Sequence, residues 1–129
     1  MASKFSLSAR SRRNLLGVHP DLVRVVERAI QITAVDFAVT EGLRTKARQA
    51  ELVKAGKSQT MNSRHLTGHA VDLAAWVGGT VSWDRPHYFK IAEAMKAAAA
   101  ELGVAIVWGG DWKTFFDGPH FELDRKVYP

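Results

Sequence analysis

The sequence contains no cysteine. This absence excludes disulfide bonds, metal sites built from thiolates and a cysteine nucleophile. It does not identify a compartment, because a protein without disulfides can also work in an oxidising space.

Long hydrophobic runs are also absent. No stretch approaches the length of apolar residues that a membrane-spanning helix needs, and no apolar signal segment follows Met1. We therefore expect no stable membrane insertion and no signal peptide. A target outside the cytoplasm would then require another component to carry the protein there.

Internal repeats, linkers and low-complexity segments are missing as well. A chain of 129 residues is typical of one domain and buries about two-thirds of its unfolded surface, which is enough for a hydrophobic core. We therefore expect one domain over residues 1–129 with no second module, and we expect a monomer.

Acidic residues are fewer than basic ones, with 13 Asp and Glu against 18 Lys and Arg and a formal net charge of +5. Such an excess favours anionic partners, among them nucleic acid, lipid headgroups and acidic polymers. A modest positive charge is equally typical of a soluble domain without such a partner. Because the chain has no arginine-rich tract and no interleaved basic and aromatic run, we expect no nucleic-acid partner.

The hydrophobic pattern predicts helices and strands along the whole chain. Apolar residues recur at the spacing of one helix face in the region that follows Pro20, and short apolar runs bounded by glycine or proline indicate strands. The predicted helices span residues 8–16, 20–33, 45–56 and 87–102, and the predicted strands span residues 36–40, 70–76, 80–83, 104–108 and 120–123. Residues 1–7 are expected to be loosely held, and residues 56–62 to form a polar loop. These elements predict an α+β domain with helices packed on a small, mainly antiparallel sheet.

One acidic residue, Asp72, lies within the apolar run from Ala70 to Trp76, which is typical of a mostly buried strand. Burying an ionised carboxylate costs several kcal/mol unless a partner charge, hydrogen bonds or a metal offsets the cost. Because side chains alternate along a strand, Asp72 shares its face with Ala70 and Ala74, whose small side chains leave space above it. The pattern therefore favours the floor of a cleft.

Two histidines can accompany this carboxylate. His65 lies upstream of Asp72, with Gly68 between them to let the chain bend, and His120 begins the last predicted strand. Histidine nitrogen and carboxylate oxygen are ligands that zinc accepts. His65, Asp72 and His120 would leave one tetrahedral position for water, which is the arrangement of a catalytic zinc site.

A further carboxylate, Asp117, precedes the last strand in the turn Asp-Gly-Pro, where it would stand near the metal as a general base. Glu122 shares the strand face of His120 and is a second candidate for the base. Purely structural roles remain possible for Asp72 and Asp117. Asp72 could form a salt bridge with one of the many basic residues, and Asp117 could simply be the first residue of a turn.

Two strings carry a family resemblance. SRHLTGHAVD, at residues 63–72, fits the pattern SxHxxGxAxD, and DGPHFE, at residues 117–122, is similar to a second motif of the same family. The sequence thus resembles the zinc D-alanyl-D-alanine carboxypeptidases and L-alanyl-D-glutamate peptidases. Further matches to phage endolysins of this family lie at residues 11–20, 40–49 and 108–112, so the resemblance covers nearly the whole chain.

This resemblance implies a hedgehog or D-Ala-D-Ala peptidase-like fold and one Zn²⁺ per chain. Carried over residue by residue, it makes His65, Asp72 and His120 the metal ligands and Asp117 the catalytic acid and base. It makes Arg44, at a strand-to-helix junction, a catalytic contact to the substrate or the oxyanion, able to grip a carboxylate with its guanidinium fork.

Two residues are expected to contact the substrate. Ser63 opens the first motif, and Trp112 follows a Gly-Gly-Asp turn in the aromatic loop before Asp117. His69 occupies a position that the motif leaves free and receives no role. Without the resemblance, Arg44 would be read as an ordinary surface arginine.

The function implied is that of a phage endolysin, a hydrolase that cleaves the L-alanyl-D-glutamate bond of the peptidoglycan stem peptide with zinc-activated water. It would act on the murein in the periplasm after release, without a cell-wall-binding module. The alternatives are a D-alanyl-D-alanine carboxypeptidase of the same family and a non-catalytic binding module that keeps zinc. A basic nucleic-acid-binding protein would explain the charge but not the buried Asp72.

Overall fold

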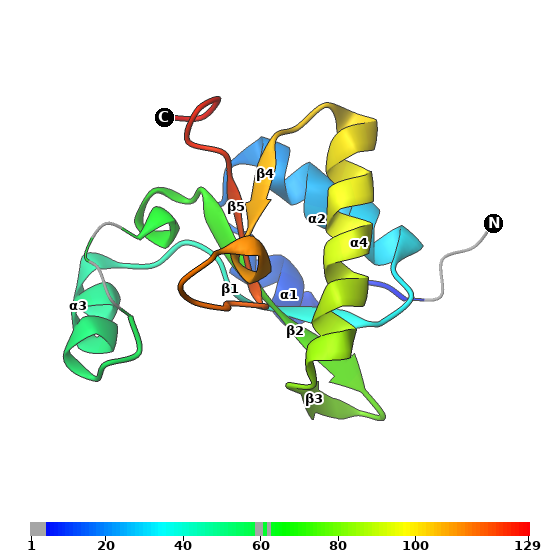
Figure 1. The fold of residues 1–129 in the computed structure, drawn as a ribbon, viewed down its shortest axis with the longest axis horizontal. Helices are drawn as coiled ribbons and strands as arrows, with labels where there is room; N and C mark the ends of the chain where they lie inside the picture. Colours follow the sequence, from blue (N-terminus) through cyan, green and yellow to red (C-terminus); the bar gives the residue numbers. More distant parts are fainter. Residues whose placement is uncertain (1–4, 59–60, 62) are drawn as a thin grey trace.

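Strand β2 (Ala70–Val77) lies inside the antiparallel sheet and pairs with three other strands. The structure, a computed structural model, describes residues 5–58, 61 and 63–129. Within these residues the sheet has five strands in the order β1-β2-β5-β4, with β3 paired to β2 (Figure 1). The other strands are β1 (Phe37–Glu41), β3 (Thr80–Ser82), β4 (Ile106–Trp108) and β5 (His120–Leu123). Every pairing is antiparallel, which confirms the predicted fold class.

The helices begin at residues that satisfy their first backbone N–H groups. The side chains of Ser8, His19 and Thr45 each accept a hydrogen bond from the first turn of the helix that follows. The α-helices are α1 (Ala9–Asn14), α2 (Pro20–Ile32), α3 (Lys46–Lys54) and α4 (Arg85–Leu102), and the 3-10 helices are η1 (Arg64–Thr67) and η2 (Gly109–Asp111). Helix α4 starts two residues before the predicted His87, because a proline at position 86 is compatible with the first turn of a helix.

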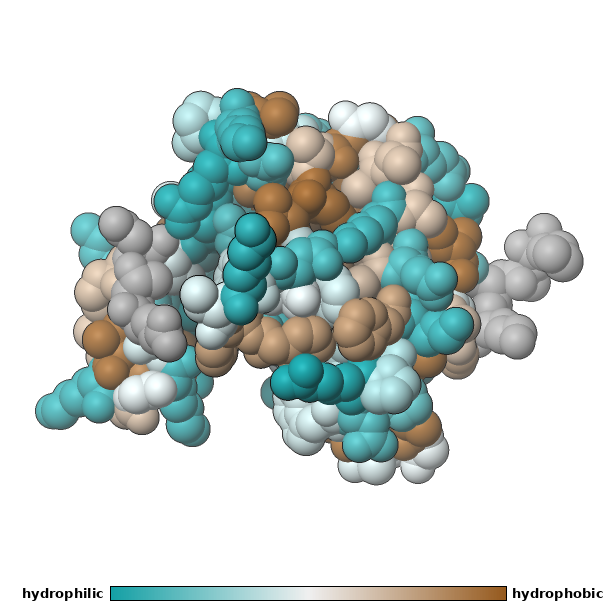
Figure 2. Space-filling view, viewed as in Figure 1, coloured by the Kyte–Doolittle hydropathy of each residue, from teal (hydrophilic) through white to brown (hydrophobic). Residues whose placement is uncertain are grey.

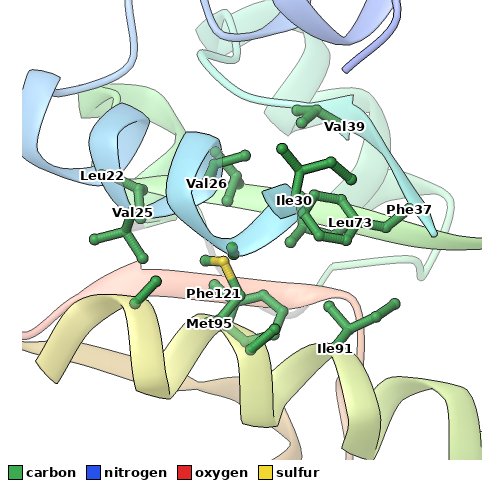
Figure 3. Close-up of a cluster of buried hydrophobic side chains, with 14 of the residues drawn as sticks. Leu22, Val25, Val26, Ile30, Phe37, Val39, Leu73, Ile91, Met95 and Phe121 are labelled. Atoms are coloured by element: carbon green, nitrogen blue, oxygen red, sulfur yellow. The ribbon is translucent and has the colours of Figure 1, made fainter. Parts of the chain in front are cut away.

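The hydrophobic core lies between the sheet and the helices α2 and α4, which pack side by side (Figures 1 and 3). Figure 3 shows the side chains of both helices meeting those of the sheet. The labelled core residues are Leu22, Val25, Val26, Ile30, Phe37, Val39, Leu73, Ile91, Met95 and Phe121. Because Leu73 and Phe121 point into this core, strand alternation directs their neighbours Asp72 and His120 to the opposite face.

The start of the chain differs from the prediction. Leu7 is buried, and Phe5 packs against the core, so the expectation of a loosely held segment is wrong for residues 5–7. Residues 1–4, the rest of that segment, lie outside the described residues. Of the predicted loop 56–62, residues 59, 60 and 62 also lie outside them.

Hydrophilic residues cover much of the face seen in Figure 2, with hydrophobic side chains gathered in its upper part. The outline of this face is notched between α3 and the β2–β3 hairpin (Figures 1 and 2). Among the described residues, no helix combines the length and apolarity needed to cross a membrane.

A glycine joins the η1 turn to the start of β2. Gly68 has φ 74° and ends η1 in the left-handed region, which residues with a Cβ rarely adopt. A Cβ on Gly68 would also clash with the carbonyl oxygen of Gly17. The carbonyl of Gly68 in turn accepts a 2.8 Å hydrogen bond from the N–H of His19. Gly68 therefore allows residues 63–72 to pack closely against the loop before α2.

Replacing this glycine should destabilise the fold more than backbone conformation alone explains. Gly56 is the matched control, because its φ is 73° but nothing lies within 4 Å of an added Cβ. We expect Gly56→Ala to lower the free energy of unfolding by about 1–2 kcal/mol, and Gly68→Ala to lower it by a further 1–3 kcal/mol, roughly the cost of overpacking. Urea denaturation measures both variants, and equal losses would show that the contact with Gly17 contributes nothing.

Candidate metal centre and active site

Three side chains from different elements converge on the sheet face opposite the core. His65 Nε2 lies 3.3 Å and His120 Nδ1 lies 3.4 Å from the same oxygen, Oδ1 of Asp72. One ligand atom from each of the three residues lies within 4.8 Å of the others. The structure thus brings together the three residues that the sequence nominates as ligands, and this group could hold a metal ion.

The sheet and a short turn set these positions. Asp72 on β2 and His120 on β5 are direct partners in the strand register, so their side chains are neighbours on one face. His65 comes from η1, where the hydroxyl of Ser63 accepts a 3.2 Å hydrogen bond from its N–H. The carbonyl of His65 accepts a 2.9 Å bond from the N–H of Arg44. Both histidines are buried, which limits their freedom to turn away.

Each imidazole has a fixed partner on the side away from Asp72. His65 Nδ1 lies 2.8 Å from the carbonyl oxygen of Gly42, and His120 Nε2 lies 2.8 Å from Oε1 of Glu122. A carbonyl or carboxylate oxygen only accepts, so these nitrogens donate when the rings are neutral. The lone pairs of His65 Nε2 and His120 Nδ1 then face Asp72. Such outer partners are typical of histidines that bind metals, and the donor set of two nitrogens and one carboxylate fits zinc.

Asp117 lies in the turn before β5, held by its main chain. Its N–H donates to the carbonyl of Gly109 at 3.1 Å, and its carbonyl accepts from the N–H of His120 at 3.2 Å. A Cβ on Gly109 would clash with the Asp117 backbone, so this glycine allows the turn to approach η2. Burial and the nearby charge of Asp72 raise the pKa of Asp117, while His120, His65 and Arg44 oppose the rise. A raised pKa brings a carboxylate closer to the range useful for proton transfer near neutral pH.

Arg44 is buried beside the three candidate metal ligands, and its guanidinium nitrogens already donate to other side chains. Nε and Nη2 each donate a 2.7 Å hydrogen bond to the carboxylate of Glu41, and Nη1 donates a 2.7 Å bond to Oε1 of Gln49. Nη2 lies 3.6 Å from Oδ2 of Asp72. The fork that the sequence assigns to a substrate carboxylate therefore holds Glu41 in this structure. The partners Glu41 and Gln49 were not anticipated, although Glu41 stands three residues before Arg44, a common spacing for an ion pair.

The other nominated residues take distinct places. The ring of Trp112 is 38% exposed and its centroid lies 5.1 Å from that of His120, so it borders the site. Trp108, by contrast, is buried and donates to the carbonyl of Gly118. Ser63 is half-buried and caps η1. Glu122, the second candidate for the base, is buried and hydrogen-bonded to His120.

His69, which the motif leaves free, points elsewhere. Its Nδ1 lies 2.6 Å from the hydroxyl of Thr67, and its ring centroid is 5.6 Å from that of His19. Burial and the nearby Arg64 lower the pKa of His69.

Several known proteins similar to this chain carry the name of one kind of peptidase. Residues 3–124 match the family described as phage L-alanyl-D-glutamate peptidase. The L-alanyl-D-glutamate peptidase of Escherichia phage T5 is 32% identical over 128 residues, which cover 96% of this chain and 93% of the relative. The enzyme of the same name from Listeria phage A118 is 37% identical over 94 residues, 73% of this chain but 32% of the relative. A solved structure, the L-Ala D-Glu endopeptidase ChiX of Serratia marcescens, has 55% identity and a TM-score of 0.92, and the match covers 98% of this chain and 95% of that one.

The charges of the metal-free group predict a pH dependence of folding. Burial alone would lower the pKa of His120, but hydrogen bonds to Asp72 and Glu122 outweigh burial and raise it to about 9. Burial alone would raise the pKa of Asp72, but hydrogen bonds to His120 and His65 hold it well below its usual range. In the metal-free protein, therefore, a protonated His120 lies beside an ionised Asp72 at neutral pH.

A histidine whose pKa is raised by folding stabilises the fold fully below its unfolded pKa, and this contribution disappears as the pH rises through the folded value. We expect the free energy of unfolding of the metal-free protein to fall by about 2–3 kcal/mol between pH 6.5 and pH 9. Urea denaturation in the presence of a chelator measures the change. His120→Gln should remove most of this dependence, and an equal slope in that variant would assign it to another group.

Proposed function

Because the chain belongs to the phage L-alanyl-D-glutamate peptidase family, we propose that it hydrolyses the bond between L-alanine and D-glutamate in the peptidoglycan stem peptide. The observation that carries the proposal is the group His65, Asp72 and His120 with the carboxylate of Asp117 in the adjoining turn. Hydrolysis of an amide needs a Lewis acid and a group that moves protons. The first three residues would hold the metal that supplies Lewis acidity, and Asp117 would move the protons.

The metal that best fits the group is one zinc ion, held by His65, Asp72 and His120. The three donors are preset by Gly42, Glu122 and the strand register, and a catalytic zinc uses three protein ligands and leaves a fourth position open. When bound, zinc supplies Lewis acidity, which lowers the pKa of water and polarises a carbonyl.

Asp117 carries out the proton transfers. As a carboxylate it accepts a proton from the attacking water, and it returns that proton to the nitrogen of the departing D-glutamate. Its burial and the proximity of Asp72 raise its pKa, which favours its acting as an acid in the second step. Among the described residues it has no salt bridge, whereas Asp72 and Glu122 both lie within salt-bridge distance of basic groups.

Arg44 and two neighbours complete the proposed site. Arg44 keeps a positive charge beside Asp72, where it favours the negative charge that develops on the carbonyl oxygen. Because its fork is occupied by Glu41, we assign it this electrostatic role and not the grip of a substrate carboxylate. The ring of Trp112 borders the group, and the hydroxyl of Ser63 caps the η1 turn that carries His65. We propose that both residues contact the stem peptide.

The wider setting follows from the family. We propose that residues 1–129 act as one monomeric peptidase domain, and that the partner is the stem peptide and not nucleic acid. The phage relatives favour a role in host lysis, in which an enzyme made in the host cytoplasm reaches the murein after release.

Removing the acid–base group should separate chemistry from metal binding. Asp117→Asn should retain zinc and the fold while kcat falls by about 10²–10⁴, the usual contribution of general acid–base catalysis. The matched control is Asp111→Asn, at the end of η2, whose exposed carboxylate pairs with Lys96 at 2.7 Å and which should stay near wild type. His65→Ala should lose metal and activity together. Near-normal turnover of Asp117→Asn with zinc bound would place the base elsewhere.

The bond itself can be identified from the cut ends. Digestion of Gram-negative peptidoglycan should expose new N-terminal D-glutamate and leave C-terminal L-alanine, as read by mass spectrometry of the muropeptides. Chelator-treated protein and Asp117→Asn serve as controls for contaminating hydrolases. Release of free D-alanine from pentapeptide stems, without new D-glutamate amines, would instead identify a carboxypeptidase.

A further inference from the structure

Arg64, the residue before the ligand His65, is buried next to the metal group. Its side chain is 9% exposed, and Nη2 donates hydrogen bonds to the carbonyl oxygens of Leu123 and Tyr128. Its Nε is the buried side-chain polar atom for which the described residues provide no hydrogen-bond partner. That nitrogen lies 3.9 Å from Oε2 of Glu122. A buried arginine beside one carboxylate requires an explanation, because a buried charge without a partner charge is costly.

Glu122 connects this arginine to the metal group. One of its oxygens, Oε1, lies 2.8 Å from His120 Nε2, and the other, Oε2, faces Arg64. Glu122 is itself buried, so its orientation depends on the few groups that contact it. The chain Arg64, Glu122, His120 thus leads to the imidazole nitrogen that faces Asp72.

We propose that Arg64 is a positioning residue of the metal centre, which holds the carboxylate of Glu122 so that Glu122 fixes the orientation of the His120 ring. The inference rests on the proposed metal site. Without Arg64, the Glu122 carboxylate would turn toward Arg125, whose Nε lies 3.8 Å from the same Oε2 but whose side chain is 60% exposed. His120 would then lose the acceptor that holds its Nε2 side, and its Nδ1 would no longer be fixed toward Asp72.

The C-terminal segment keeps Arg64 in place. Tyr128 supplies one of the carbonyl acceptors of Arg64, and its hydroxyl donates a 2.7 Å hydrogen bond to Oδ2 of Asp21 at the start of α2. Its ring also lies edge-on to His19, with centroids 5.3 Å apart. The main chain therefore anchors the arginine at Nη2, with Nε 3.9 Å from Oε2 of Glu122.

The two arginines beside Glu122 provide a matched comparison. Arg64 and Arg125 lie at nearly equal distances from Oε2 but differ in burial, and a buried charge is screened far less than an exposed one. We expect Arg64→Gln to weaken zinc binding by about 10–100-fold, the usual effect of losing an outer partner of a metal ligand. Arg125→Gln should change it by less than about threefold. Competition with a zinc chelator of known affinity measures both, and equal effects would overturn the proposal.

A second measurement separates positioning from general stability. Glu122→Gln removes the charge that Arg64 holds, so Arg64→Gln made in that background should add little further loss of zinc affinity, whereas independent effects would add. Nitrogen-15 spectra of the zinc-loaded wild type should show His120 bound through Nδ1 with a hydrogen-bonded Nε2–H, and this signal should shift in Arg64→Gln.

The outcomes distinguish this proposal from the proposed function. If Arg64→Gln melts at a lower temperature without metal but binds zinc as tightly as wild type, Arg64 is structural and the positioning role is wrong while the peptidase activity stands. If wild type itself binds no zinc, the proposed metal site fails. Should Arg64→Gln not fold, the additivity test is made with Arg64→Lys. Lysine keeps the positive charge but has a single nitrogen, so it cannot contact both the main-chain carbonyls and Glu122 as arginine does. Full additivity of its effect with that of Glu122→Gln would refute the coupling.

Discussion

The structure depends on the compensation of one carboxylate, that of Asp72 in the interior strand of the sheet. An ionised group in this position is costly unless charges and hydrogen bonds surround it. His65 and His120 share one of its oxygens, and Arg44 lies within ion-pair distance of the other. The hydrogen bonds to His120 and His65 outweigh burial, hold the pKa of Asp72 well below its usual range and keep the carboxylate ionised. The contacts that stabilise the Asp72 carboxylate also place two imidazole nitrogens beside it. The same interactions therefore stabilise the strand and arrange the three metal ligands.

Strand alternation allows the sheet to serve this purpose without weakening the core. On β2 and β5, residues such as Leu73 and Phe121 pack against α2 and α4 (Figure 3). Asp72 and His120 face the other way, because side chains alternate along a strand. Because the two polar residues are register partners, their approach requires no special loop. The loop elements are needed only for His65 and Asp117, and there glycines at positions 68 and 109 permit the close backbone approaches.

Much of this could be predicted from the sequence. A buried Asp72, strand alternation and the two motifs were sufficient to nominate His65 and His120, and the structure brings all three together. Trp112 was preferred over Trp108 as a cleft residue because it follows a turn. In the structure Trp112 is partly exposed beside His120, whereas Trp108 is buried. The partners of Arg44 could not be predicted, because Gln49 reaches it only when the turn between β1 and α3 is formed. Nothing in the string SRH indicated that Arg64 would be buried, since its partners Leu123 and Tyr128 lie about sixty residues away.

The carboxylates around the site differ in the groups that hold them, and this difference separates their roles. Glu41 is held by Arg44, and Glu122 by His120 with Arg64 nearby. A carboxylate held in this way is fixed in position, which suits the orientation of another side chain. Asp72 also lies within salt-bridge distance of basic groups, whereas Asp117 has no salt bridge in the described part of the chain. Burial and the nearby Asp72 raise the pKa of Asp117. Asp117, which has no salt bridge among the described residues, is thus the carboxylate best suited to exchange protons. Glu122 and Glu41, which do form ion pairs, instead hold His120 and Arg44 in position.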